Sequence, residues 1–145
     1  RDDWEALLQA PFAVYSTVAG ADEPATEAQF RRLGDEILAG QGAFPDATIG
    51  RAMAEAVAAN VDMLWGAYHA SGRKPHDVIK RAVKALGRAP DDEAVAIRDW
   101  LLAMAVRIAE ASRMAGEAAV SPVETSAIRD LAGWLQRPMP ETPQD

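Results

Sequence analysis

Five carboxylates at the starts of two apolar helical segments are the residues of this sequence whose chemistry points most directly to a ligand. Asp22, Glu23 and Glu27 lie in the stretch DEPATEAQF, and Glu117 and Glu124 lie in EAAVSPVET. Carboxylate oxygens are the ligands of hard cations such as Ca²⁺ and Mg²⁺, which take about six or more oxygens. Neither stretch has the alternating ligands, central glycine and final glutamate of an EF-hand loop. A calcium or magnesium site therefore requires both stretches, with all five carboxylates meeting in space.

Helix capping explains the same stretches without a ligand. Thr26 is followed three residues later by Gln29, and Ser121 is followed three residues later by Glu124. A hydroxyl with Gln or Glu at this spacing is typical of a capping box, in which both side chains satisfy amide groups of the first helical turn. Acids near a helix start also complement the helix dipole, by roughly 0.3–1 kcal/mol each. Cation binding and capping both remain open for the five carboxylates.

The elements that would position these residues are helices, because helical periodicity covers nearly the whole chain and strand alternation occurs nowhere. We expect an all-α fold, a single compact bundle of about six helices over residues 1–137, and a proline-rich tail over 138–145. The helices are expected at about 3–19, 26–40, 47–70, 75–87, 91–116 and 121–136.

Two of these helices carry more specific expectations. The helix over 91–116 is apolar around so much of its circumference that we expect it at the centre of the bundle. In the helix over 47–70, Asn60 projects with Met53 and Val57 on the apolar side, which predicts a buried amide that needs partners.

The chain also contains an imperfect internal repeat. A shift of 95 positions superposes four pairs of residues: Asp22 on Glu117, Ala25 on Val120, Thr26 on Ser121, and Gln29 on Glu124. A long helical segment precedes the acidic loop in both copies. The repeated unit is therefore long helix, acidic loop and capped helix, and it predicts a pseudo-twofold arrangement of two helix–loop–helix halves.

The two stretches AGADEPATEAQF and AGEAAVSPVETSAI resemble the TerB-like family of bacterial tellurite-resistance proteins. That family carries twice a motif of the form acidic-Gly-x-[Val/Ile]-[Ser/Thr/Asp]-x-x-Glu at a helix–helix junction. The opening DWEALLQAPFAVYSTVAGAD is similar to its first helix and acidic loop. The resemblance implies a compact all-α domain with an acidic surface, a metal-ion site near the two junctions, and a role in stress response or protein scaffolding without known catalysis.

The resemblance also implies which positions would form the metal-ion site. These positions are Asp22 and Glu117 in the loops, and Gln29 and Glu124 at the third helical positions. The sequence departs from the family pattern at the residue after each loop acid, where Glu23 and Ala118 replace glycine and remove the easy tight turn. It departs again at Gln29, which replaces glutamate and takes one charge away.

Composition excludes several classes of function. The net charge of −7 opposes sequence-independent binding to DNA or RNA, and the absence of cysteine excludes zinc–thiolate sites and fits a cytoplasmic location. No window approaches about eighteen consecutive apolar residues, so no transmembrane segment is expected. His69 and His76 fit no zinc signature and are expected at the surface. Catalytic signatures such as Gly-x-Ser-x-Gly are missing, so we do not expect an enzyme.

A basic segment interrupts this acidic chain. It contains Arg73, Lys74, Lys80, Arg81, Lys84 and Arg88. Lysines four residues apart on a helix usually mark its solvated face. The alternatives are that the segment holds an anion or an acidic partner, or that it drives head-to-tail association with the acidic loops of another copy.

These observations together predict a non-enzymatic, cytoplasmic, TerB-like module that binds a partner protein, with Ca²⁺ or Mg²⁺ as the cation its acidic junctions would hold. The alternative is a purely structural or homo-oligomeric helical domain in which the acids only cap helices. A further alternative is an enzyme with an acidic site of an unrecognised kind.

Overall fold

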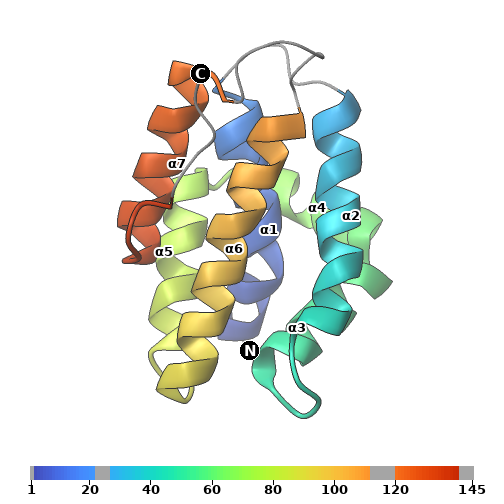
Figure 1. Cartoon of the computed structure of the whole chain (residues 1–145). Helices are drawn as coiled ribbons and strands as arrows, with labels where there is room; N and C mark the ends of the chain where they lie inside the picture. The colour runs from blue at the N-terminus through green and yellow to red at the C-terminus, as the bar shows by residue number, and fades with distance from the viewer. Residues whose placement is uncertain (1, 22–26, 112–119, 141–145) are drawn as a thin grey trace.

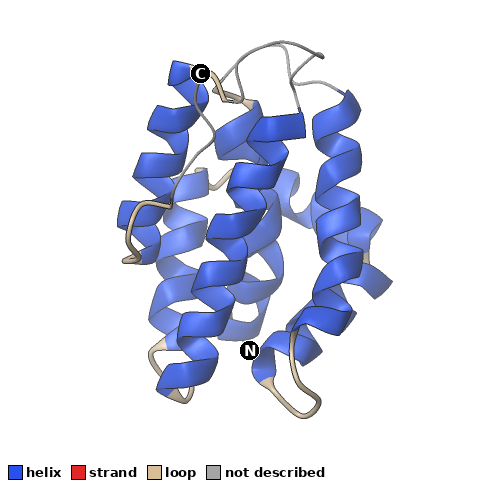
Figure 2. Cartoon of the chain, viewed as in Figure 1, coloured by secondary structure: helices blue, strands red, loops and turns tan. Residues whose placement is uncertain are grey.

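The computed structural model describes residues 2–21, 27–111 and 120–140 (Figure 1). Within these ranges the backbone forms helices and no strand (Figure 2). The helices are α1 (Asp2–Ala19), α2 (Glu27–Ala43), α3 (Ile49–Ala59), α4 (Val61–Ser71), α5 (Pro75–Leu86), α6 (Asp91–Ala111) and α7 (Pro122–Leu135). The prediction of a compact all-α bundle is confirmed, and the described residues contain seven helices where about six were expected.

The additional helix arises because the segment expected as one helix over residues 47–70 is divided at Asn60. The backbone angles of Asn60 are φ −135° and ψ 32°, outside the helical region. Its side-chain amide donates a hydrogen bond of 2.9 Å to the carbonyl oxygen of Ala56, and the residue is exposed. The prediction of a buried Asn60 is wrong, because an asparagine side chain can bond to nearby backbone and so competes with helix continuation.

The central helix of the bundle is α1, which contacts every other helix of the described chain. Six successive residues from Ala10 to Tyr15 are buried, so this helix is covered on all sides. In contrast, α6 packs against α1, α2, α3 and α7. The prediction that the helix over 91–116 lies at the centre is therefore wrong. Its wide apolar surface serves two contacts, one with the core and one with α2.

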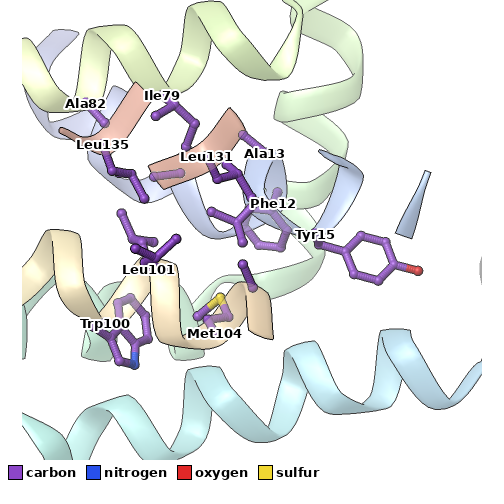
Figure 3. Close-up of a cluster of buried hydrophobic side chains, with 14 of the residues drawn as sticks. Phe12, Ala13, Tyr15, Ile79, Ala82, Trp100, Leu101, Met104, Leu131 and Leu135 are labelled. Carbon is purple, nitrogen blue, oxygen red and sulfur yellow. The ribbon is translucent and has the colours of Figure 1, made fainter. Parts of the chain in front are cut away.

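The hydrophobic core takes side chains from all seven described helices, and one part of it lies between α1, α5, α6 and α7. Figure 3 shows side chains from these helices that point toward one another, among them Phe12, Ile79, Leu101 and Leu131. Each of these four side chains is almost completely buried. Trp100 lies on the other side of α6 from Leu131 (Figure 3). That side of α6 faces α2, and a Cβ placed on Gly40 of α2 would lie 2.7 Å from Cζ2 of Trp100.

Candidate functional site

The capping box expected at the second acidic junction is present at the start of α7. The backbone N–H of Glu124 donates to Oγ of Ser121 at 3.2 Å, and the backbone N–H of Ser121 donates to Oε1 of Glu124 at 3.4 Å. Pro122 occupies the first helical turn, where its missing N–H removes no helical hydrogen bond. The equivalent residue of the first junction, Thr26, lies outside the described residues.

A buried hydrogen bond joins the first turns of α2 and α7. Nε2 of Gln29 donates to Oε2 of Glu124 at 2.9 Å, and also lies 3.4 Å from the carbonyl oxygen of Ile108. Gln29 is 0% exposed and Glu124 is 1% exposed. Because Oε1 of Glu124 accepts from Ser121, the two oxygens of this carboxylate serve two different elements. Glu124 therefore acts at once as a helix cap and as a tertiary contact.

The five predicted cation ligands lie in different parts of the chain. Asp22, Glu23 and Glu117 fall outside the described residues. The side chain of Glu27 is 86% exposed and pairs with Arg31 at 3.0 Å, in contrast to the buried Glu124. Among the described residues, no group of three or more His, Cys, Asp or Glu side chains could hold a metal ion. The cation site stays a prediction that depends on the three undescribed acids.

A groove of about 550 Å³ between α2 and α6 is the feature that the sequence reasoning missed. Its lining is mostly apolar, with four alanines and two aromatic rings: Ala39, Ala43, Phe44, Pro45, Ala96, Trp100 and Ala103. These alanines recur at helical spacing on the two helices that face each other (Figure 1). Short side chains at such positions leave space between two helices, but the alanine spacing alone does not identify which helices face each other.

Charged side chains border this groove. Arg107 of α6 donates to Glu36 of α2 across it at 2.8 Å, and Glu36 is 8% exposed. Arg137, which follows α7, donates to both oxygens of Asp99 at 2.6 and 3.3 Å. The bidentate geometry fixes this end of the described chain against α6.

A second hollow of about 120 Å³ shares Phe44, Pro45 and Ala96 with the groove, and is lined in addition by Asp92 and Glu93. Among the residues that line these two adjacent hollows, the carboxylates of Glu36, Asp92, Glu93 and Asp99 outnumber the guanidinium of Arg107. The lining is therefore mostly apolar with an excess of acidic over basic side chains.

Both histidines are exposed and contact tryptophans. The ring of His69 meets that of Trp65 edge to face at 4.3 Å between centroids, and His76 stacks on Trp134 at 4.5 Å. The prediction of surface histidines is confirmed. The tryptophan of each pair is partly buried, so each histidine covers part of an apolar side chain.

No family model, no curated protein and no solved structure matches this chain. The TerB-like resemblance accordingly stays a prediction. None of the helices in the described ranges has the length and apolarity that crossing a membrane requires.

Proposed function

We propose that this chain is a non-enzymatic helical module that binds a segment of a partner protein in the groove between α2 and α6. The observation that carries this proposal is the groove itself, whose volume of about 550 Å³ is in the range of binding pockets. Its floor contains the rings of Phe44 and Trp100, which meet edge to face at 5.5 Å. Phe44 is 6% exposed and Trp100 is 9% exposed, so the two rings form a rigid floor, and the exposed apolar contact comes from Ala39, Ala43 and Ala96.

The charges of the groove specify the chemistry of the partner. Its lining carboxylates outnumber the guanidinium of Arg107, and the whole chain has a net charge of −7. Such a surface attracts basic segments and repels acidic ones. The occupant is therefore a segment with an apolar side chain, which fills the space above Trp100. Its Lys or Arg residues approach Asp92 and Glu93, which form no ion pair with an arginine of the described chain.

Synthetic peptides test this proposal. One set carries Leu or Phe between Lys and Arg residues, and a matched set carries the same apolar residue between Asp and Glu. Calorimetric titration at fixed ionic strength should detect binding of the basic set alone. Ala39→Leu fills the groove and should weaken binding by about tenfold, which corresponds to roughly 1.4 kcal/mol.

The matched control is Ala67→Leu, which adds the same side chain to an exposed alanine of α4 outside the groove. This variant should bind as the unmodified chain does. Equal binding of the basic and acidic peptide sets, or equal effects of the two substitutions, would contradict the proposal.

We also propose that the acidic junctions hold a divalent cation, as the TerB-like resemblance implies. The hydrogen bond between Gln29 and Glu124 supports this second proposal, because it brings together the first turns of the two helices that follow the acidic stretches. Since Glu124 is already bonded to Ser121 and Gln29, most of the ligands must come from Asp22, Glu23 and Glu117.

Cation binding is tested by the melting temperature. A cation that binds the native state stabilises it by about 2.7 kcal/mol at a hundredfold excess over the dissociation constant. Ca²⁺, Mg²⁺, Mn²⁺ and Zn²⁺ should be titrated separately. The stabilisation should disappear in the double variant Asp22→Asn with Glu117→Gln. An absence of any shift, or an equal shift in the double variant, removes the cation from the proposal without affecting the groove.

A further inference from the structure

A separate hollow lies between α1 and the beginning of α5. Its volume is about 130 Å³, and its polar lining consists of Glu5, Gln9, Ser71, Arg73 and Arg81. It shares no residue with the groove between α2 and α6. The hollow contains two of the cations of the basic segment, and neither the groove nor the acidic junctions use them.

The two guanidinium groups of this hollow lack internal partners. Within the described chain, no ion pair or side-chain hydrogen bond joins Arg73 or Arg81 to another residue, although Glu5 lines the same hollow. Other arginines of the described chain do pair with carboxylates, as Arg88 does with Asp3 and Arg107 with Glu36. Arg73 and Arg81 therefore retain their full hydrogen-bonding capacity toward a ligand.

The segment that connects α4 to α5, together with α5 itself, determines the positions of Arg73 and Arg81. Oγ of Ser71 donates to the carbonyl oxygen of Tyr68 at 2.7 Å and accepts from the backbone N–H of Arg73 at 3.2 Å. Gly72 between them has a φ of 67°, a left-handed conformation that glycine adopts without strain. Arg81 is half-buried in α5, the helix that packs against α1. The backbone on both sides of the hollow is thus held by ordered contacts.

We propose that this hollow binds the phosphoryl group of a phosphate monoester. A guanidinium group matches the oxygens of phosphate bidentately, and two guanidinium groups balance the charge of a dianion. The volume accommodates a phosphoryl group, and the rest of the ligand extends into solvent. The carboxylate of Glu5 opposes a dianion, and therefore limits the affinity of the site.

Inorganic phosphate is the first probe, added at constant ionic strength while the amide and arginine Nε–H resonances are followed by NMR. Saturable shifts are expected at Arg73 and Arg81. Arg81→Lys keeps the positive charge but loses the planar guanidinium group that binds two phosphate oxygens at once, so it should weaken phosphate binding several-fold. Arg81→Gln should weaken binding by about tenfold or more, since a hydrogen bond to a charged group contributes about 1.5–3 kcal/mol. Glu5→Gln should strengthen it.

Matched controls separate this site from general electrostatics. Lys84→Gln removes one positive charge from the exposed side of α5, and Asp62→Asn removes one negative charge from exposed α4. Each should change the affinity much less than Arg81→Gln does, because neither side chain lines the hollow and both are exposed to screening by salt. Chemical shifts that keep changing linearly with phosphate concentration, without saturation, would overturn the proposal. A loss of affinity in Lys84→Gln as large as that in Arg81→Gln would also overturn it.

Two further probes identify the source of the phosphoryl group. Glycerol phosphate represents a small phosphorylated molecule, and a short peptide with one phosphoserine represents a modified protein. The proposal requires both to compete with inorganic phosphate. Tighter binding of the peptide assigns the site to phosphorylated chains, and equal binding assigns it to small monoesters. Failure of both to compete contradicts the site, whereas the peptide-binding groove would be unaffected.

Discussion

Nε2 of Gln29 lies 2.9 Å from Oε2 of Glu124, and both side chains are buried. The two residues are 95 positions apart and fall on equivalent positions of the internal repeat. Equivalent residues that meet each other would lie on the axis of a pseudo-twofold arrangement, which stays a prediction for this chain. Two glutamates at this point would bring like charges together in the interior. Glutamine instead supplies an N–H donor to the carboxylate of Glu124, so an amide fits position 29 better than a second carboxylate would.

The first prediction concerns this pair. Gln29→Glu replaces a donor with a second carboxylate and should lower the free energy of unfolding by about 2–4 kcal/mol at neutral pH. The double variant Gln29→Glu with Glu124→Gln reverses the roles of the two side chains. The new amide at position 124 could then donate to the new carboxylate at position 29 and still accept from Ser121, so more than half of the lost stability should return.

Urea unfolding of the two single variants and the double variant forms a mutant cycle that measures the coupling directly. A coupling energy near zero means that the double variant loses as much stability as the two single variants together. That result would show that the contact at 2.9 Å contributes nothing specific.

The second prediction compares two glycines of α2. A Cβ at Gly40 would lie 2.7 Å from Cζ2 of Trp100, whereas a Cβ at Gly34 meets no atom within 4 Å. Gly34→Ala should raise the free energy of unfolding by about 0.4–1 kcal/mol, because alanine restricts the unfolded chain. Gly40→Ala should lower it by about 1–3 kcal/mol, because Trp100 must move. Denaturant unfolding of both variants measures the difference, and stabilisation by both would show that α2 and α6 are not in close contact at Trp100.

The third prediction concerns a cap supplied from another helix. Oε1 of Glu93, in the first turn of α6, accepts from the backbone N–H of Ile49 at 2.7 Å at the start of α3. Glu93→Ala should cost about 0.5–2 kcal/mol of stability, as the loss of a helix cap usually does. Glu93→Gln keeps an acceptor and should cost less. Hydrogen exchange at the amide of Ile49 provides the local readout, and unchanged protection in Glu93→Ala would rule out the cap.

Local features of this fold could be predicted from the sequence because they depend on neighbours along the chain. Ser121, Pro122 and Glu124 fix the start of α7 through contacts within four residues. The turn at Gly72 and Pro75 separates α4 from α5 in the same way. The prediction that Asn60 is buried failed for a local reason. Its spacing matched an apolar stripe, but its side chain forms a hydrogen bond with the backbone of Ala56.

The features that could not be predicted depend on which helices become neighbours. The groove between α2 and α6 exists because Ala39 and Ala43 of one helix come to face Ala96 and Ala103 of the other. Nothing in the spacing of either helix identifies its partner. The contact between Gln29 and Glu124 is intermediate, because the repeat pairs the two positions, although only the three-dimensional structure shows that they touch.

The fourth prediction concerns alkaline pH. Burial raises the pKa of Tyr15 above its ordinary value of 10.0. Burial also raises the pKa of Tyr68, and a hydrogen bond with Ser16 partly offsets that rise. Above pH 10.0 the tyrosines of the unfolded chain lose protons that the native state retains, so the unfolded state binds fewer protons and the free energy of unfolding falls as pH rises. The contribution of the two tyrosines to the free energy of unfolding is complete below pH 10.0. It is lost as pH rises through their pKa values in the folded protein.

These are the two tyrosines of the chain, so tyrosinate absorbance reports on them alone. The midpoint should lie above 10.0 in the native protein and return to that value in urea. Tyr15→Phe and Tyr68→Phe together should flatten the fall in stability above that pH. Native and unfolded titrations that coincide would mean that neither hydroxyl is shielded from water, and would contradict the packing of Tyr15 and Tyr68 against Trp65.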